Sequence, residues 1–395
     1  MRILVLAPHP FYIVRGTPID LELVVRVLSR RPAAKIDLVV YNEGEERTYP
    51  NVTIHRTRDT KLTRNLRPGF TIKKLLCDAF MFFKAWSLIR QNEYDLIHAG
   101  EEAVYMAMLF RRMYGVPYAY DLDSSLAEQM TEKIRWLRPA QGLLNAFERA
   151  AIRGAVITFP VCNSLADLCI GNGSSRVVTL HDISQLKDPD RRQTGRLKRE
   201  LGIEGLILLY AGNLEPYQGV DLLLEGFAGA AKRTDQVDLV IVGGSEEDIG
   251  KYRKKAESLG VGSRSHFIGP KPFEQLDEYL AEADILTAPR IKGRNTPMKV
   301  FPYLHSGRAL LVTDLPTHSQ IISNEVAMLA KPTAADFAEA ILTLARDDDK
   351  RRLLGGNGRA FVEANHTYEA HRARLNDAYD WIEHKSSTAS TGTSR

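Results

Sequence analysis

The sequence predicts an α/β protein with two domains, each built on a parallel sheet. Short apolar, β-like runs alternate with helical segments along the whole chain, which is typical of parallel strands joined by crossover helices. A polar, proline-bearing segment at 185–200, QLKDPDRRQTGRLKRE, separates two such series. With 395 residues the chain is also too long for one ordinary core. We therefore expect two Rossmann-like domains, with the cleft between them as the ligand site.

The first series of runs ends before the polar segment. Its helices are expected over 18–30, 72–90 and 102–113. Its strands are expected over 2–8, 36–41, 52–57, 96–100, 118–123, 154–162 and 176–182. Two serines follow the run YAYDLD at 118–123, and serine is a frequent helix cap, so this strand should end near Leu122.

The second series has the same form, with strands expected over 206–212, 237–244, 265–270, 283–289 and 309–314. The stretch 289–314, PRIKGRNTPMKVFPYLHSGRALLVTD, indicates a basic loop, a short apolar helix closed by Ser306-Gly307, and a buried strand that ends at Asp314. A loop, a helix and a strand tip of this kind are where open α/β sheets bind phosphorylated ligands.

The composition is that of a globular protein, with 44% apolar and 26% charged residues. The three cysteines (Cys77, Cys162, Cys169) lack metal-site spacing, so we expect buried thiols in a reducing compartment. The chain opens directly into a strand, which leaves no room for a signal peptide, and no apolar run approaches the roughly 20 residues of a membrane helix. We therefore expect a cytoplasmic protein, at most resting on the inner face of the membrane.

The net charge of +4 excludes little, but the basic residues gather in 61–90, where seven Lys or Arg accompany one acid, Asp78. Apolar residues recur there at helical spacing and predict a core-packed face, while Lys73, Lys74 and Lys84 project elsewhere; that face comprises Ile72, Leu75, Leu76, Ala79, Phe83 and Trp86. The basic face either is simply solvated or also contacts anionic lipid head groups, at ~1 kcal/mol per cation. Nucleic acid is not an expected partner, because no binding motif accompanies the patch.

The turn GNLEPYQGVD at 212–221 follows a buried strand and opens a helix. Glycines at 212 and 219 let the backbone approach a ligand closely, and a helix N-terminus favours anions. Taken alone, the segment fits a plain strand–helix turn equally well.

The order and spacing of this turn, VGG at 242–244, FIGPKPFEQL at 267–276, ADILTAPR and the stretch 289–314 are more specific. Together the series resembles the retaining, nucleotide-sugar-dependent glycosyltransferases of family 4, which have the two-domain fold called GT-B. The resemblance runs from RGTPI at 15–19 to HTYEAHRARLNDAYDWI at 366–382. It implies a nucleotide-sugar co-substrate and no cofactor.

The resemblance also implies that the last helix crosses back onto the N-terminal domain. The expected organisation is therefore an acceptor-side domain over 1–184, a linker over 185–200 and a nucleotide-sugar-binding domain over 201–365. A returning helix over 366–385 and a disordered tail over 386–395 follow.

This sequence departs from the family pattern at the donor site. The family's E-x(7)-E acids would stand at 294 and 302, where this chain has Arg294 and Pro302. The Arg and Lys that clamp the diphosphate correspond to the neutral Asn213 and Gln218. Pro302 must either lie near the start of its helix or kink it, because an interior proline costs ~3 kcal/mol. A diphosphate needs a compensating cation, so the positive charge should come from elsewhere.

Some branches of the family carry P-x-K-x-[FY]-x-Y, which Pro297, Lys299, Phe301 and Tyr303 fit. We expect Arg290 to bind two phosphate oxygens through its fork and Lys299 to add a point charge. The predicted donor-binding residues are Gly212, Asn213, Gln218, Gly219, Gly244, Arg290, Gly293, Asn295, Thr296 and Lys299. The alternative is that the basic loop residues form a solvated cluster.

On the acceptor side, the resemblance matches Gly16 and Thr17 to the first loop and brings Glu101 near the acceptor. The catalytic candidates are Asp123, Asp121 and His98, at two strand ends. Side chains alternate along a strand, so both aspartates cannot point inward unless the strand has already ended. A histidine at a strand end is as often held by the backbone as catalytic. No metal site is expected, because cationic residues are expected to take the place of a metal at the diphosphate.

These observations predict a metal-independent, retaining transferase that moves a hexose or related sugar from a UDP- or GDP-sugar. The acceptor is expected to be a glycan or lipid-linked precursor in cell-surface polysaccharide assembly. In such enzymes the leaving phosphate helps to deprotonate the acceptor hydroxyl, and the protein supplies positioning and electrostatic stabilisation. Two alternatives remain: a catalytically degenerate, nucleotide-binding scaffold and a sugar epimerase with the same fold.

Overall fold

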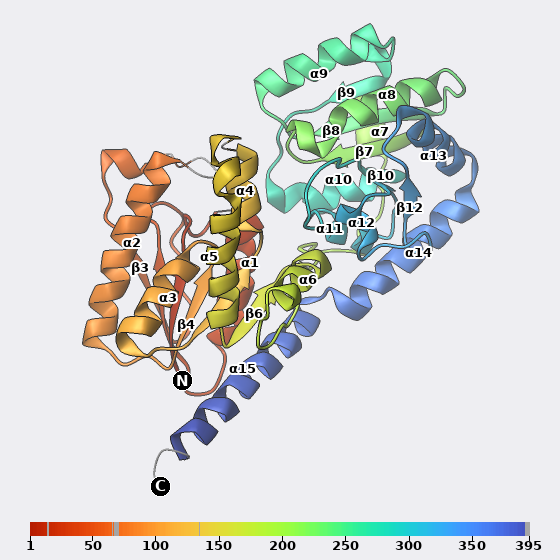
Figure 1. Ribbon diagram of the computed structural model, residues 1–395. Helices are drawn as coiled ribbons and strands as arrows, with labels where there is room; N and C mark the ends of the chain where they lie inside the picture. The colour runs from red at the N-terminus through yellow and green to blue at the C-terminus, as the bar shows by residue number, and fades with distance from the viewer. Residues whose placement is uncertain (14–15, 65, 67–70, 134, 392–395) are drawn as a thin grey trace. The chain divides into compact units, whose positions relative to one another are not determined.

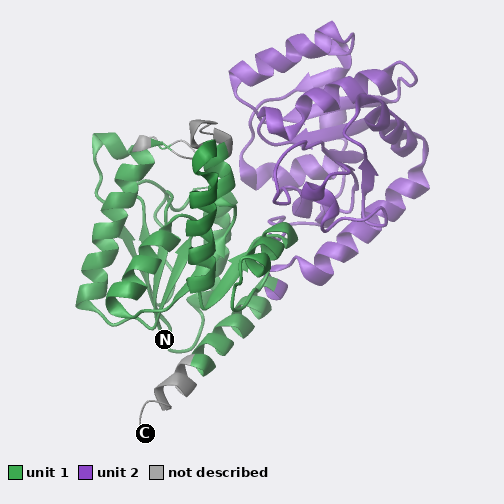
Figure 2. Ribbon diagram, viewed as in Figure 1, with its two compact units in different colours: residues 1–181, 371–395 green, residues 182–370 purple. Residues whose placement is uncertain are grey.

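The computed structural model describes residues 1–13, 16–64, 66, 71–133 and 135–391. The chain forms two compact units: residues 1–181 together with 371–395, and residues 182–370 (Figure 2). The helix α15 (Tyr368–Thr391) therefore belongs almost wholly to the first unit, although it follows the second in sequence. Its assignment continues through Thr391, into the segment expected to be disordered, while the helix α7 (Arg196–Leu201) lies in the polar segment.

Unit 1 contains a six-stranded sheet with every neighbouring pair parallel, in the order β3-β2-β1-β4-β5-β6 (Figure 1). The strands are β1 (Arg2–Ala7), β2 (Lys35–Val40), β3 (Val52–Arg56), β4 (Leu96–Gly100), β5 (Tyr118–Leu122) and β6 (Ile157–Pro160). The other helices are α1 (Gly16–Leu28), α2 (Ile72–Gln91), α3 (Ala103–Tyr114), α4 (Leu126–Lys133), α5 (Gln141–Gly154) and α6 (Asn163–Gly171), with short 3-10 turns at η1 (Lys61–Thr63) and η2 (Arg135–Ala140).

Unit 2 repeats this architecture, with strand order β12-β11-β10-β7-β8-β9. Its strands are β7 (Leu206–Ala211), β8 (Val237–Val242), β9 (Ser265–Phe267), β10 (Ile285–Ala288), β11 (Ala309–Thr313) and β12 (Met328–Ala330). Its helices after α7 are α8 (Val220–Ala231), α9 (Glu246–Ser258), α10 (Leu276–Glu282), α11 (Val300–His305), α12 (Pro316–Ser319), α13 (Ala334–Arg346) and α14 (Asp348–Asn365), with 3-10 turns η3 (Pro216–Gln218), η4 (Gly262–Arg264) and η5 (Phe273–Gln275). Two Rossmann-like domains are therefore present, as the alternation of runs predicts.

Alternate residues of the unit 2 strands build two cores, one on each face of the sheet. Leu208 and Leu311 pack with the helices α8 and α13, while their neighbours Ile207 and Leu310 pack with α10 and α11. A sheet covered on both faces explains why these strands are continuous apolar runs rather than alternating ones. The carboxyl ends of the strands remain as the open edge.

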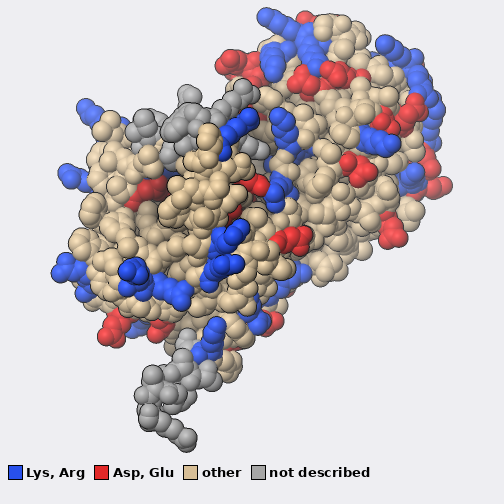
Figure 3. Space-filling view, in the orientation of Figure 1, with Lys and Arg blue, Asp and Glu red and all other residues tan. Residues whose placement is uncertain are grey.

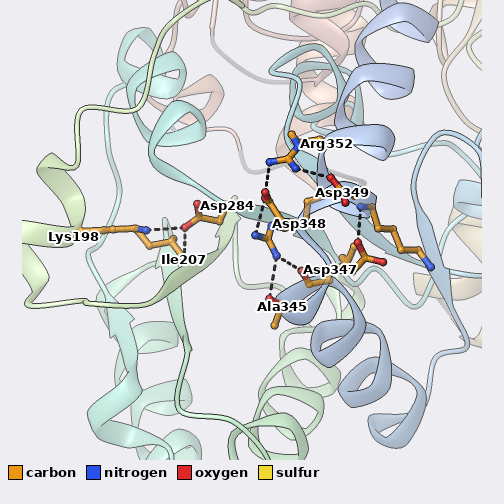
Figure 4. Close-up of polar contacts among 11 residues, drawn as sticks. Lys198, Ile207, Asp284, Ala345, Asp347, Asp348, Asp349 and Arg352 are labelled. Carbon is orange, nitrogen blue, oxygen red and sulfur yellow. Dashed lines mark hydrogen bonds and ion pairs between the residues drawn. The ribbon is translucent and has the colours of Figure 1, made fainter.

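Polar contacts fix the outer elements of unit 2 (Figure 4). The carboxylate of Asp284, just before β10, accepts a hydrogen bond from the Ile207 amide at 2.9 Å and pairs with Lys198 of α7 at 3.1 Å. At the start of α14, Asp347 caps the helix by accepting from the Lys350 amide at 2.8 Å, and Arg352 pairs with Asp349 at 2.5 Å. These contacts anchor α7 and α14 to the sheet and to the end of α13.

The segment 176–182, expected to be a strand, forms only one bridge, between Val177 and Thr158 of β6. The amides of Val178 and Leu180 still donate to Thr158 and Pro160, so the backbone runs alongside β6 without completing a ladder. The strand prediction is wrong here because an apolar run identifies extended backbone but not its hydrogen-bonded partner.

The helix α2 spans nearly the predicted residues, but its buried face differs from the prediction. Leu75 and Phe83 are 49% and 58% exposed. The face in the core is formed instead by Cys77, Met81, Ala85 and Leu88. Both faces of this helix carry apolar residues at helical spacing, so periodicity alone could not identify the inner one.

Candidate functional site

In unit 2, Lys299 at the start of α11 lies against the end of β7. Its Nζ donates to the hydroxyl of Tyr210 at 3.0 Å and lies 4.1 Å from the centroid of that ring. Gly212 follows β7 with φ of +150°, and a Cβ there would lie 2.3 Å from the lysine Nζ. The first glycine of the predicted turn therefore makes room for the predicted cation, across 87 residues of sequence.

Arg290 leaves the sheet directly after β10 and folds over its own loop. Its Nε donates to the Lys292 carbonyl at 2.7 Å, and one terminal nitrogen donates to Asn295 Oδ1 at 3.1 Å. Gly293 has φ of +116°, and a Cβ there would meet the guanidinium at 2.3 Å. The ring of Tyr217 lies 5.3 Å from the guanidinium carbon. These contacts come from neutral groups and orient the guanidinium fork.

Burial and nearby positive charge lower the pKa of two basic groups at this site. Burial, followed by the charge of Arg290, lowers the pKa of Lys299 to about 7. Burial, with further contributions from Arg290 and Lys299, lowers the pKa of His318 in α12 to about 3. The smaller, coulombic part of these shifts comes from the two cations and would favour an anion beside them, whereas the larger burial part opposes any charge.

Several of the remaining predicted donor residues have structural roles. A Cβ at Gly219 would lie 1.9 Å from the Pro289 carbonyl oxygen, and a Cβ at Gly244 would lie 2.5 Å from Leu214. The interpretation that Gly219 lets a ligand approach is therefore unnecessary, because the chain's own packing requires glycine there. Asn213 is exposed, whereas Gln218 and Thr296 are buried.

Two tyrosines complete the strand end, and the sequence alone singled out one of them, Tyr303, from its place in the P-x-K-x-F pattern. Its hydroxyl accepts from the Ala211 amide at 2.7 Å and donates to the Ala211 carbonyl at 2.8 Å. Tyr210, whose hydroxyl donates to the Asn213 carbonyl at 2.5 Å, was missed. Its position within an apolar run gave no sign of a polar role.

Arg294 and Pro302, which stand where the family has its two acids, lie in different environments. Arg294 is exposed, and its carbonyl accepts from Gln320 at 2.8 Å. Pro302 is buried as the third residue of α11, so it lies in the first turn, where the missing amide is tolerated.

In unit 1, a cavity of about 320 Å³ opens where the first strands end. It is lined by the loop after β1, by Tyr41 after β2 and by the residues that follow β4. The lining residues are Pro8, His9, Pro10, Ile13, Gly16, Thr17, Pro18, Tyr41, Leu66, Lys74, Glu101, Glu102 and Gln129. The three predicted acceptor-side residues, Gly16, Thr17 and Glu101, are therefore brought together.

Lys74 corrects the prediction that it projects from a solvated face. Its ammonium lies in the cavity, 2.5 Å from a carboxylate oxygen of Glu102. Although burial opposes its charge, Glu102 and the neighbouring acids raise the pKa of Lys74. The error has the same origin as the misassigned face of α2, since Lys74 lies on the inner side with Cys77 and Met81.

The predicted catalytic pair His98 and Asp121 forms a network beside β4 and β5. His98 is 1% exposed, and its Nδ1 lies 2.8 Å from the hydroxyl of Tyr379 in α15. Its Nε2 lies 3.2 Å from the carboxylate of Asp121. Neither residue lines the described cavity, and the network ties the returning helix to the sheet. Asp123 follows the end of β5 and is partly buried.

Burial shifts the pKa of several groups in the cavity and beside it. Burial, followed by the charge of Glu102, raises the pKa of Glu101 to about 8. The pKa of His9 is lowered to about 4, mainly by burial. Beside the cavity, burial raises the pKa of Asp78, whose carboxylate accepts from the Tyr41 hydroxyl at 2.5 Å, to about 6. A polar cavity that contains one ion pair suits a ligand rich in hydroxyl groups.

Among the described residues, no group of three or more His, Cys, Asp or Glu is arranged to hold a metal ion. In the same part of the chain, every helix is too short or too polar to cross a bilayer.

Residues 194–361, most of unit 2, match the model of the family "Glycosyl transferases group 1". A D-inositol 3-phosphate glycosyltransferase of Corynebacterium efficiens is 24% identical over 314 residues, which are 73% of this chain and 71% of the relative. For the enzyme of the same name from Corynebacterium glutamicum, identity is 27% over 214 residues, so that alignment covers 50% of this chain and 49% of the relative.

Solved structures share the fold over almost the whole chain. Sucrose-phosphate synthase from Thermosynechococcus elongatus has a TM-score of 0.77 at 17% identity, covering 97% of this chain and 99% of that one. Anabaena Alr3699/HepE, in complex with UDP-glucose, has a TM-score of 0.72 at 15% identity, covering 96% and 99%. The family match in unit 2 and the curated relatives support a glycosyltransferase, and the two parallel sheets have the GT-B fold of the solved structures.

Proposed function

We propose that the protein is a retaining, metal-independent transferase that takes a hexose or related sugar from a UDP- or GDP-sugar. The observation that carries this proposal is the pair of cations at the open edge of unit 2, with Lys299 over Gly212 and Arg290 held by its loop. Arg290 would bind the diphosphate through its fork, and Lys299 would add the second positive charge. The complex of Anabaena Alr3699/HepE with UDP-glucose supports a donor of this class.

The acceptor would bind in the cavity of unit 1 and belong to a glycan or lipid-linked precursor of surface polysaccharide. The proton of its attacking hydroxyl would pass to the leaving phosphate oxygen while the sugar–phosphate bond breaks and the new glycosidic bond forms. Unit 2 would stabilise the charge that grows on the diphosphate. His98 and Asp121 would act indirectly, by fixing the strand ends and α15.

Titrating UDP, GDP and their sugar conjugates against single variants tests the donor site. Arg290→Ala should weaken binding of the preferred nucleotide sugar by roughly 1.5–3 kcal/mol, because a charge-assisted hydrogen bond is lost. Arg253→Ala, which removes an exposed arginine from α9, serves as the matched control and should bind like the wild type. Unchanged affinity in Arg290→Ala would show that the diphosphate binds elsewhere.

The second candidate is a nucleotide-binding scaffold without turnover. The observation that favours it is the loss of both family acids, since Arg294 and Pro302 cannot accept hydrogen bonds from ribose hydroxyls through side chains. Measuring UDP or GDP release from nucleotide sugars, with and without glycan acceptors, separates the two functions. Tight binding with no release and no change in any conjugate would support the scaffold; an epimerase would instead return a nucleotide sugar with one inverted centre and no free nucleotide.

We also propose that the exposed face of α2 binds an anionic membrane surface. Leu75 and Phe83 are exposed on this face, Arg90 is exposed two turns beyond Phe83, and Lys73 is exposed at the flank. In Figure 3, Lys and Arg side chains are spread along the edge of unit 1 where α2 lies. Apolar side chains among cations fit an interfacial helix that is held by both insertion and charge.

A further inference from the structure

Glu101 lies where β4 ends, between the predicted acceptor-side loop and the start of α3. It shares the 320 Å³ cavity with Gly16 and Thr17, and ligand sites typically measure roughly 300–1,000 Å³. The hydroxyl of Ser124 donates to both of its carboxylate oxygens, at 3.2 and 2.9 Å. The carboxylate is therefore held in place but retains lone pairs for another donor, since an ionised carboxylate has about four acceptor positions.

The rest of the cavity suits a ring that carries hydroxyl groups. Pro8, Pro10 and Ile13 provide apolar surface, while His9 and Thr17 provide hydrogen-bonding groups. The ion pair of Lys74 with Glu102 presents a donor and an acceptor 2.5 Å apart. Neighbouring hydroxyls of a sugar both donate and accept, so such a pair can bind one hydroxyl while a second carboxylate binds the next.

The other acidic candidates at this edge are less suitable. Asp121 is 3.2 Å from the buried His98, and that histidine is held in turn by Tyr379, so this network belongs to the packing of α15. Asp123 does not appear among the described residues that line the cavity. Glu101 is the acidic side chain that both lines the cavity and directly follows a central strand.

We propose that Glu101 receives the hydrogen bond of the acceptor hydroxyl that is glycosylated, and that the Lys74–Glu102 pair binds a neighbouring hydroxyl. This inference rests on the proposed function and assigns the acceptor a polyhydroxyl ring at the reacting end. In its ionised form Glu101 accepts the hydrogen bond of the hydroxyl and takes no proton from it. The hydroxyl proton goes to the phosphate oxygen that leaves with the nucleotide, so the carboxylate is unchanged after each turnover.

The binding test uses methyl α-glucoside, methyl α-mannoside and methyl β-galactoside as neutral probes, detected by saturation-transfer NMR at millimolar concentration. Glu101→Gln keeps the shape of the side chain and should weaken the best probe at least fivefold. Glu93→Gln is the matched control and should bind like the wild type. Glu93 is exposed in the loop before β4, at the other end of this strand from Glu101. UDP titration of the same samples should be unchanged, which separates a failure of this inference from a failure of the donor site.

The pH dependence of binding separates a direct contact from a structural role. The charged or titratable groups around Glu101 are Glu102, Lys74, Asp121 and Tyr120. Because the pKa of Glu101 is raised to about 8, the ionised acceptor form becomes more populated as the pH rises from 6.5 to 9. Probe binding should strengthen over this range in the wild type and stay flat in Glu101→Gln.

Three outcomes would overturn the proposal. They are no binding of any probe by the wild type, equal binding by wild type and Glu101→Gln, and wild-type binding that weakens as the pH rises. Circular dichroism of each variant excludes loss of folding as the cause. If Glu101→Gln unfolds, Glu101→Asp, which keeps the charge but shortens the side chain, replaces it and should bind more weakly with the same pH trend.

Discussion

Lys299 is the residue whose charge depends most on whether a ligand is present. With a pKa of about 7 in the free protein, about half of its ammonium is deprotonated at pH 7. A bound diphosphate would raise this pKa, so binding should take up about half a proton at pH 7. Calorimetric titration of the nucleotide sugar in buffers of different ionisation enthalpy measures this uptake.

The affinity for the nucleotide sugar should depend on pH through the protonation of Lys299. Below pH 7 the cation is already present, so affinity should be constant; above pH 7 the proton must be acquired, so affinity should fall by up to tenfold per pH unit. Lys299→Met should bind more weakly and show neither uptake nor slope, whereas Lys254→Met on the exposed side of α9 should behave like the wild type. Equal heats in all buffers would place the lysine outside the diphosphate site.

At this scale, residue types and motifs pointed to Arg290, Lys299 and Gly212, because phosphate chemistry and turn geometry restrict which residues fit. The partners of these residues could not be read in the same way. Tyr210 meets Lys299 across 89 positions, and Lys74 meets Glu102 across 28, through contacts that depend on which faces of strand and helix pack together. Sequence periodicity gives such faces only when one side of an element is polar.

At the scale of elements, the turn after β7 and the turn before α8 use glycine for different reasons. A Cβ at Gly212 would displace the flexible end of Lys299, whereas a Cβ at Gly219, where φ is +76°, would meet the backbone oxygen of Pro289. Gly212→Ala should therefore weaken nucleotide-sugar binding, and because φ at Gly212 is +150° it should also lower the free energy of unfolding. Gly219→Ala should lower the free energy of unfolding by about 1–3 kcal/mol.

Urea unfolding and UDP titration of both variants check this pair of expectations. Gly250→Ala, at a helical glycine of α9 where a Cβ would have open space, is the control; it should leave UDP binding unchanged and raise the free energy of unfolding by up to about 1 kcal/mol. Normal UDP binding in Gly212→Ala would mean that nucleotide binding does not depend on the position of Lys299.

Variants on the exposed face of α2 test whether this face binds a membrane. Leu75→Ser with Phe83→Ser should release the protein from anionic vesicles, and Lys73→Glu with Arg90→Glu should do so more strongly at low salt. Lys74 stays unchanged in these variants, because it belongs to the cavity. Leu353→Ser, at an equally exposed leucine of α14, is the control for general loss of apolar surface. Co-sedimentation that is the same for all variants, or absent in the wild type, would contradict the proposal.

The helix α2 and the segment 176–182 each have one property that could be predicted from the sequence and one that could not. The boundaries of α2 were predictable from its length and period, but its inner face was not, since Leu75 and Phe83 recur as regularly as Cys77 and Met81. For 176–182 the extended backbone was predictable, but pairing depends on how far the neighbouring strand β6 continues.

At the scale of the whole molecule, the chain passes into unit 2 once and returns once, and α15 packs on unit 1. Arg31 contacts Asp380 at 2.6 Å and Glu383 at 3.1 Å, and Tyr379 is buried beside His98. A site for a specific protease inserted after the exposed Arg192 would separate residues 1–192 from 193–395. Because the second fragment carries α15, the two fragments should remain together on size exclusion.

The same cut in a variant with Arg31→Glu and Tyr379→Ala tests whether α15 makes this connection. These changes remove the ion pairs and a buried ring, so the fragments should separate more readily at equal concentration. Separation of the fragments from the otherwise native protein would show that α15 does not hold unit 1 after cleavage.

The return of α15 also sets the order in which the polypeptide can mature on the ribosome. Domains generally fold as units during synthesis, the N-terminal one first. Here the sheet of unit 1 emerges first, but the surface around His98 and Phe159 that receives Tyr379 stays uncovered until the last helix leaves the exit tunnel. Unit 2 emerges complete at an earlier point. The nascent chain should therefore complete unit 2 before α15 completes unit 1.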